Sequence, residues 1–170
     1  MTPAPLVLRI ACPADVPTLA LMSRDLIESG LGWHYRAERI EKLRGDPEVV
    51  TLVACLGATI TGFAILQFNG ERAHLVLLAV HAAHQRRGIG RRMVQWLLET
   101  AATAGAASVH VELRAGNAAA HALYQAAGFE ESLRLGGYYR GRETAVRMVR
   151  TMRLPGLAPQ IWHPPSLDRR

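Results

Sequence analysis

The chain has 170 residues, of which 49% are apolar and 20% are charged, and it carries a formal net charge of +6 at neutral pH. This composition is typical of an ordinary soluble globular protein, and the length allows one domain, or one domain with a tail. No apolar run is long enough to span a membrane. The positive charge favours an anionic partner, which is a nucleic acid, a membrane surface or a small phosphorylated ligand.

Two features of the sequence predict a cytoplasmic protein. Cys12 and Cys55 lie far apart without paired spacing or a histidine pattern. This argues against a disulfide framework or a zinc site and favours a reducing compartment. The first residues hold only a five-residue apolar stretch, broken by Arg9, which is too short for the core of a signal peptide.

The first half of the chain alternates between strand and helix patterns. Short apolar runs predict strands, and apolar residues at three- and four-residue steps predict helices. In chain order, we expect a strand at 6–11, a helix at 13–30, a shorter polar helix at 35–46, strands at 49–56 and 60–68 joined by a turn at 57–59, and a strand that follows an Asn-Gly turn within 69–80.

The second half predicts a helix at about 90–104 behind an arginine-rich loop, a strand at 108–114, a helix at 117–128, and closing strands at 129–135 and 143–152 around a Gly-Gly-Tyr-Tyr loop. This order of elements predicts a mixed sheet with helices on both faces. We expect residues 1–154 to form the domain. Four prolines from Pro155 onward predict a C-terminal tail at 155–170.

The arginine-rich loop reads "HQRRGIGRRM" and leads into the helix that begins near Gly90. A helix N-terminus carries partial positive charge, so arginines there repel it unless an anion sits among them. Gly88 and Gly90 let the backbone approach a ligand closely, and phosphate is the usual ligand of such a turn. The loop therefore predicts a polyphosphorylated ligand, although a basic surface turn has the same composition. The arginines are Arg86, Arg87, Arg91 and Arg92.

Two well-known phosphate loops do not fit this segment. The mononucleotide P-loop ends in Gly-Lys-Ser/Thr, whereas this loop ends in Gly-Arg-Arg and has no hydroxyl to hold magnesium. The dinucleotide fingerprint needs a third glycine where this chain has Met93. A nucleic-acid patch usually spreads over several elements and often includes aromatic residues, whereas the charge here is concentrated at one loop.

Residues 74–129 resemble the GCN5-related N-acetyltransferase (GNAT) superfamily. "LLAVHAAHQRRGIGRRMV" is similar to its acetyl-CoA pyrophosphate loop, and "VHVELRAGNAAAHALYQAAGF" resembles the signature of its ribosomal-protein alanine N-acetyltransferase branch. The resemblance implies an α+β fold (an α/β/α sandwich) with a mostly antiparallel sheet of six to seven strands, splayed at the central strands. It implies acetyl-CoA as the cosubstrate and no metal.

The resemblance also implies which residues bind the cosubstrate. Asn117 is expected to bond the pantetheine, and Tyr124 to lie beside the sulfur. Helical geometry supports this pair, because residues seven apart share one face, roughly 10 Å apart along the axis. The strand residues Leu78, Ala79 and Val80 are expected to pair with the pantetheine as if it were an added strand. The pyrophosphate loop is expected to comprise Arg86, Arg87, Gly88, Ile89, Gly90 and Arg91.

Acetyl transfer needs a neutral amine, a stabilised oxyanion and a proton for the departing thiolate. Backbone N–H groups near Leu78 to Val80 are candidates for the oxyanion. Tyr124 is the candidate proton donor, with packing as the alternative role. The matching branch places its base at Glu112, which otherwise simply faces water. His74 stands where many relatives have glutamate, so it is a second candidate base, or a structural residue.

Four aromatic residues are candidates for contact with the acceptor. Tyr138 and Tyr139 resemble a loop that some protein N-terminal acetyltransferases fold over the substrate peptide; a hairpin with a packing tyrosine is the alternative. Trp33 and Tyr35 occupy the other wall at which relatives recognise substrate.

The sequence thus predicts an enzyme that moves an acetyl group from acetyl-CoA to a primary amine by direct attack in a ternary complex. A protein or peptide α-amine is the expected acceptor. The alternatives are a small-molecule amine (an amino-acid derivative, an antibiotic or a polyamine) and an acyl-CoA-binding module without catalysis. We expect a monomer or homodimer that binds neither nucleic acid nor membrane.

Overall fold

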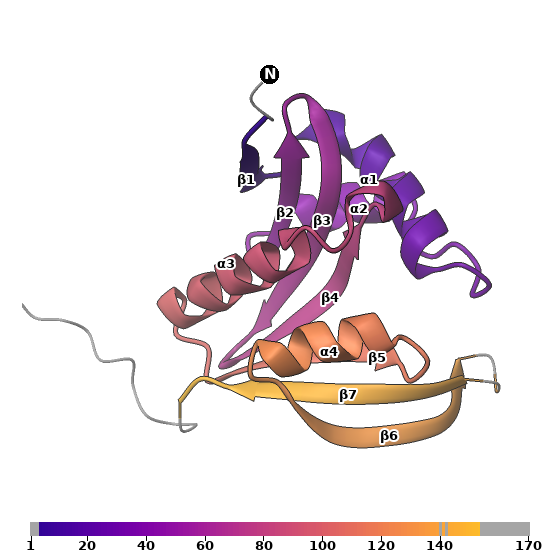
Figure 1. Cartoon of the computed structure of the whole chain (residues 1–170). Helices are drawn as coiled ribbons and strands as arrows, with labels where there is room; N and C mark the ends of the chain where they lie inside the picture. Colours follow the sequence, from indigo (N-terminus) through magenta and orange to yellow (C-terminus); the bar gives the residue numbers. More distant parts are fainter. Residues whose placement is uncertain (1–3, 140, 142, 154–170) are drawn as a thin grey trace, which may run out of the picture.

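The computed structural model describes residues 4–139, 141 and 143–153. In this part of the chain, seven strands form one sheet in the order β1-β2-β3-β4-β5-β7-β6, and only the neighbours β4 and β5 run parallel (Figure 1). The mixed, mostly antiparallel sheet is as predicted. The strands are β1 (Leu6–Ile10), β2 (Val49–Leu56), β3 (Thr59–Asn69), β4 (Arg72–Val80), β5 (Ser108–Arg114), β6 (Glu130–Tyr139) and β7 (Glu143–Thr151).

Helices cover both faces of the sheet, as expected. The α3 and α4 helices pack on one face, over a core that includes Leu52, Met93 and Val109. The α1 and α2 helices pack on the other face, over a core that includes Leu19 and Phe63. The helical segments are η1 (Pro13–Asp15), α1 (Val16–Met22), η2 (Ser23–Ile27), α2 (Ala37–Arg44), η3 (Ala82–His84), α3 (Ile89–Thr103) and α4 (Ala118–Ala126).

The predicted helix at 13–30 is not one regular helix. It consists of the 3₁₀ turn η1, the α-helix α1 and the π-helical segment η2, and it ends at Ile27. The backbone N–H of Glu28 bonds to the Ser23 carbonyl, five residues back, which is the π-helical spacing. Gly30, expected as the stop, lies in the loop beyond with a φ of 79°.

The predicted Gly-Gly-Tyr-Tyr loop is also different, because residues 136–139 belong to β6. Leu135 pairs with Ala145 and Tyr139 with Glu143, so β6 has two more residues than β7 over this stretch. Gly137 takes a φ of 65°, which accommodates the irregular backbone. The sequence signal for a turn therefore marks a bulge within the strand.

The sheet splays between β4 and β5. These strands pair only from Arg72 to Leu75 and from Ser108 to Val111, after which they diverge (Figure 1). A bulge at Val76 accompanies this change, since Leu75 and Leu77 pair with consecutive residues of β3. Leu75 consequently packs in the α3 and α4 core, whereas Leu77 packs in the α1 and α2 core. The splayed centre expected for the fold is present.

The chain termini add little to this picture. The predicted tail at 155–170 lies outside the described residues, so the division into domain and tail stays a prediction. Within the described part of the chain, no helix is long and apolar enough to cross a membrane. Cys12 is exposed, Cys55 is buried, and neither forms a disulfide.

Candidate active site

A cleft of about 730 Å³ occupies the opening between β4 and β5. Its walls are residues 75–78 of β4, residues 111–114 of β5, α4 up to Tyr124, and the chain around the end of η2. The cleft exists because the two strands stop pairing at Leu75 and Val111. It is the place where the sequence predicts acetyl transfer.

A second cavity of about 570 Å³ joins the cleft to the arginine-rich loop. The N-terminal end of α3 and the outer surface of α4 form its walls. The two cavities share Leu26, Leu78, Asn117 and Ala120, so a continuous groove runs from the arginines to the splayed strands. A long ligand with a charged end and a reactive end fits this shape.

The backbone of the arginine-rich loop has a conformation suited to an anion. Arg86 and Gly88 take left-handed conformations, with φ of 61° and 77°. Alternating backbone conformations of this kind turn successive N–H groups toward one point. The Gln85 side chain donates to the Val80 carbonyl at 2.9 Å, which holds the loop against the end of β4. A Cβ at Gly88 meets no atom within 4 Å, so the space above this glycine is open.

The four arginines of this loop are exposed, and none forms an ion pair with a carboxylate among the described residues. The first turn of α3 contains no acidic residue either. Unbalanced guanidinium groups beside a helix N-terminus repel the helix dipole, and a bound anion removes that repulsion. The geometry fits a diphosphate.

The predicted pantetheine residues lie along the groove. Leu78, Ala79 and Val80 pair with β3, but beyond Leu75 the edge of β4 that faces β5 has no strand partner among the described residues. Asn117 caps α4, since its Oδ1 accepts from the Ala120 N–H at 3.1 Å. Its Nδ2 has no partner within the described part of the chain and is available to a ligand.

Tyr124 reaches the cleft from α4. The residue is 4% exposed, and its ring packs edge-on against Phe129, with 5.4 Å between the ring centroids. Burial raises the pKa of the Tyr124 phenol well above its usual value, so the hydroxyl stays protonated at neutral pH. Among the described residues the hydroxyl has no hydrogen-bond partner. The phenol therefore has a proton to donate and no competing partner among the described residues.

Glu112 reaches the cleft from the other face of the sheet. Its neighbours Val111 and Leu113 are buried in the α3 and α4 core, so Glu112 points away from that core, as the predicted alternation requires. Arg147 of β7 donates from Nε to Oε2 of Glu112 at 3.0 Å. Oε1 has no partner among the described residues. One carboxylate oxygen can therefore accept a proton.

His74 lies on β4 opposite His110, which is two residues before Glu112 on β5. These three side chains line a third cavity, of about 260 Å³, but Glu112 also lines the cleft and His74 does not. Partial desolvation lowers the pKa of His74, Arg147 lowers it further, and Glu112 opposes the shift. The imidazole is therefore neutral at neutral pH and can accept a proton.

The predicted substrate residues are more scattered. Tyr138 is 49% exposed, and its hydrogen bond to Arg147 is one cause of the raised pKa of that guanidinium, after Glu112. Tyr139 lies in β6 opposite Glu143, and its side chain is outside the description. Arg147 therefore links Tyr138 to Glu112, since it contacts both side chains.

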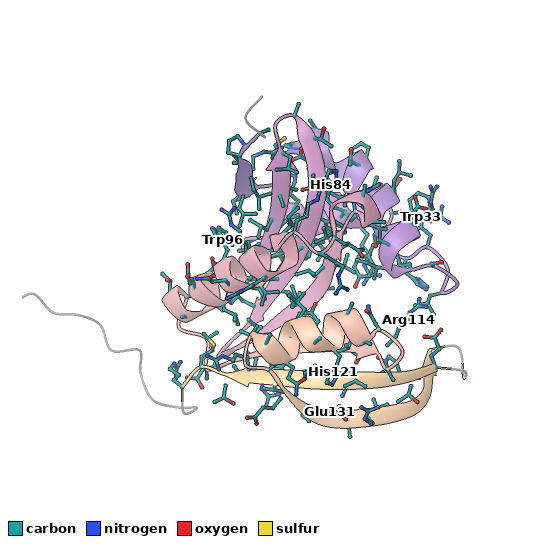
Figure 2. All side chains as sticks on the ribbon, in the orientation of Figure 1. Trp33, His84, Trp96, Arg114, His121 and Glu131 are labelled. Carbon is teal, nitrogen blue, oxygen red and sulfur yellow. The ribbon has the colours of Figure 1, made fainter. Side chains whose placement is uncertain are left out.

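Trp33 and Tyr35 line none of the three cavities above. The Trp33 indole donates to the Ala20 and Tyr35 carbonyls at 3.2 Å, and Arg39 covers the Tyr35 ring at 4.1 Å. Figure 2 shows Trp33 beside the helices at the outer edge of the molecule. Their role in acceptor binding stays a prediction.

Sequence reasoning did not identify the residues that form the helical wall of the cleft. These are Leu26, Ile27, Ser29 and Leu31. Arg114, also unassigned, holds this wall in place: its guanidinium donates to the carbonyls of Ile27 at 3.2 Å and Ser29 at 2.9 Å (Figure 2). No sequence pattern links residue 114 to residues 85 positions earlier, so only the fold reveals this contact.

Within the described part of the chain, no three His, Cys, Asp or Glu side chains gather in a way that could hold a metal ion. The chemistry of the groove is that of arginines and backbone amides at one end and a carboxylate and a phenol at the other. This arrangement suits an extended anionic donor and a proton-transfer reaction.

Comparison with known proteins agrees with this geometry. Residues 20–129 match the model of the Acetyltransferase (GNAT) family, so the chain belongs to that family. A curated relative, the [ribosomal protein bS18]-alanine N-acetyltransferase of Salmonella typhimurium, is 39% identical over 93 residues. This match covers 53% of the chain and 63% of the relative, a little under two thirds of its length.

Solved structures share the fold. The ribosomal-protein-S18-alanine N-acetyltransferase of Escherichia coli superimposes with a TM-score of 0.78 at 24% identity, over 93% of this chain and 99% of that one. Arabidopsis thaliana NAA60, in complex with acetyl-CoA, superimposes with a TM-score of 0.77 at 16% identity, over 87% and 99% of the two chains. At these identities the likeness establishes the fold.

Proposed function

We propose that this protein transfers an acetyl group from acetyl-CoA to the α-amine of a protein or peptide. The observation that carries the proposal is the continuous groove from the unpaired arginines to the opening between β4 and β5. Membership of the GNAT family supports the reaction class. The naming of the Salmonella relative as an alanine N-acetyltransferase supports an α-amine as the acceptor.

The residues of the groove fit acetyl-CoA along its length. Arg86 to Arg91 would hold the pyrophosphate, mainly through backbone N–H groups around Gly88. The open edge of β4 at Leu78 to Val80 and the amide of Asn117 would hold the pantetheine. Bound there, acetyl-CoA supplies an activated thioester beside Glu112 and Tyr124.

The protein's own groups then handle two protons. Glu112 accepts a proton from the acceptor amine through its open Oε1, and the amine attacks the thioester carbonyl directly. Backbone N–H groups near Leu78 stabilise the oxyanion. Tyr124 donates its phenolic proton to the departing thiolate, and solvent reprotonates the phenolate. His74 is the second candidate base.

An α-amine suits this machinery better than a lysine does. Its pKa is about 8, against about 10.4 for lysine, so a larger fraction is neutral at neutral pH. The overall positive charge also disfavours polycationic acceptors such as polyamines. A cytoplasmic location fits the two cysteines, neither of which forms a disulfide.

The proposal is tested by measuring free thiol released from acetyl-CoA and by mass spectrometry of the acceptor. The panel comprises a short peptide with a free N-terminal alanine, the same peptide blocked at its N-terminus but containing lysine, and small amines including a polyamine. We expect turnover with the free α-amine only. Turnover confined to small amines assigns the alternative acceptor class, and CoA binding without any turnover indicates a silent module.

A parallel titration with CoA and with an oligonucleotide tests the remaining alternative, which is a protein that binds nucleic acid. We expect CoA to bind and the oligonucleotide to bind weakly, with an affinity that falls steeply as salt rises. Tight oligonucleotide binding without CoA binding overturns the proposal, since the arginine-rich loop would then serve nucleic acid.

A further inference from the structure

Arg147 is the charged residue nearest to the open carboxylate of the candidate base. It stands opposite Glu112 in the register of β5 and β7, and its Nε donates to Oε2 at 3.0 Å. The Glu112 side chain is 20% exposed and the Arg147 side chain 47%. Neither the signature motifs nor the cosubstrate groove includes Arg147.

The contact constrains Glu112 without blocking it. A guanidinium that forks onto a carboxylate occupies both oxygens, whereas Arg147 bonds to Oε2 alone and leaves Oε1 without a partner among the described residues. A carboxylate held by one oxygen cannot rotate freely. The bond to Oε2 therefore limits the orientations of the carboxylate and leaves Oε1 able to accept a proton.

Arg147 is itself held from a third strand. The Arg147 guanidinium also donates a hydrogen bond to Tyr138 of β6; Glu112 first, and then Tyr138, raises the pKa of Arg147. The bulge after Leu135 gives β6 the extra residues among which Tyr138 lies. Three strands thus contribute to one row, in which Tyr138 contacts Arg147 and Arg147 contacts Glu112.

We propose that Arg147 is a positioning residue for the acetyl transfer, which fixes the Glu112 carboxylate so that its open oxygen receives the proton of the acceptor amine. The inference rests on the proposed function. The other charged or titratable side chains that line the cleft and the third cavity with Glu112, among the described residues, are Arg72, His74, His110, Arg114, Tyr124 and Glu143. Arg114 is committed to the chain after η2 and to Glu143.

If Arg147 had a purely structural role, its removal would act through the stability of the fold. A half-exposed ion pair adds little to folding, because solvent screens it and side-chain entropy opposes it. Removal of Arg147 should therefore leave the fold intact. A misdirected catalytic group slows the chemical step without weakening the binding of either substrate.

The test uses the full chain with acetyl-CoA and the free α-amine peptide. We expect Arg147→Met to lower kcat about tenfold while both KM values stay within about twofold of wild type. Arg147→Lys keeps a charged donor and should recover most of the loss. Arg134→Met is the matched control, because Arg134 is an exposed arginine of β6 whose partner is Glu131; its kcat should equal that of wild type.

A double-mutant cycle makes the test specific to Glu112. In the Glu112→Gln background, Arg147→Met should cause no further loss of kcat, because the group that it positions is already disabled. An unchanged kcat in Arg147→Met overturns the inference, and so does an equal loss in both backgrounds. If thermal denaturation shows that Arg147→Met does not fold, Arg147→Gln, which also removes the charge, takes its place with the same expected loss of kcat and the same double-mutant cycle.

The wild-type assay separates this inference from the proposed function. Wild-type turnover with normal turnover in Arg147→Met overturns the positioning role alone. An absence of wild-type turnover with every amine overturns both.

Discussion

Tyr124 and Glu112 enter one cleft from opposite faces of the sheet, and their surroundings differ accordingly. Tyr124 lies in an apolar core that keeps its phenol protonated. Glu112 lies in a polar row, beside Arg147 and near His74. The proposed reaction needs one group that donates a proton and one that accepts it, and the cleft brings the two together.

We predict that Tyr124→Phe binds CoA like wild type but loses about a hundredfold in kcat, because the ring still packs against Phe129 while the proton donor is gone. Calorimetry with CoA and steady-state turnover measure the two quantities. Unchanged turnover removes Tyr124 from the mechanism. A parallel loss of CoA affinity shows that the hydroxyl binds rather than donates.

Asp15 supplies a pH dependence that is independent of catalysis. Arg9 donates to both of its carboxylate oxygens, at 2.7 and 3.0 Å, and the Cys12 N–H donates at 2.8 Å. These bonds, that of Arg9 first, lower the pKa of Asp15 from 3.8 to about 2. The stability contributed by the charged form is complete above about pH 4 and is lost as pH falls toward 2.

Asp15→Asn should therefore unfold more easily than wild type at neutral pH, by about 1–2 kcal/mol after allowance for the exposure of Arg9. The difference should shrink as pH falls from about 4 to 2, because wild-type Asp15 becomes neutral as well. Urea denaturation across this range measures it. A constant difference contradicts the assignment of the low pKa to the Arg9 contact.

At the scale of elements, the turn into α3 combines an open backbone with unbalanced charge. We predict that Gly88→Trp lowers CoA affinity at least about a hundredfold, because the indole fills the space above the loop that a diphosphate needs. Gly70→Trp is the matched control: Gly70 also has a positive φ and open space around it, but lies in the turn between β3 and β4. Calorimetry should show near wild-type affinity for the control. Normal affinity in Gly88→Trp places the diphosphate elsewhere.

The helical wall of the cleft depends on a second buried carboxylate. Glu28 is 6% exposed and accepts from the Ser23 hydroxyl at 3.0 Å and from the N–H groups of His34 at 2.7 Å and Tyr35 at 3.1 Å. It thereby joins η2 to the chain that precedes α2. Arg114 holds the same wall from β5.

We predict that Glu28→Ala lowers the free energy of unfolding by about 3 kcal/mol, since three donors lose their acceptor. If the loosened wall contacts the acceptor, as we propose, the peptide KM should rise more than the CoA KM. Glu38→Ala, an exposed glutamate of α2, should change stability by less than about 0.5 kcal/mol. Equal urea midpoints for the two variants contradict this role of Glu28.

The sequence predicted the bounds of helices and strands well where a segment has a single clear hydrophobic periodicity. The alternation of Val109, Val111 and Leu113 gave β5 its observed bounds, and the apolar steps of Met93, Val94 and Leu97 gave α3 to within a residue at each end. Prediction was wrong where tertiary contacts decide. The hydrogen bonds of Ser23 and Glu28 favour a π-helical segment inside an apparently regular helix, and pairing with β7 draws the Gly-Gly-Tyr-Tyr stretch into β6.

The candidate site shows the same division. Residues 78–91 and 112–124 come from two continuous motifs, so sequence alone predicts them as a set. The wall around Leu31, its anchor Arg114 and the partner of Glu112 come from segments far apart in the chain. No periodicity connects such residues, and their proximity follows only from the order of strands in the sheet.

At the scale of the whole molecule, the short contact between β4 and β5 has a mechanical consequence. Four residue pairs join the half of the sheet that contains β1 to the half that contains β6. A ligand that pairs with the free edge of β4, beyond Leu75, would bridge these two halves. Binding of acetyl-CoA should then stabilise the whole domain against unfolding. At a free acetyl-CoA concentration a thousandfold above Kd, binding raises the free energy of unfolding by about 4 kcal/mol. The concentration of acetyl-CoA would therefore set how well the protein withstands heat and proteolysis.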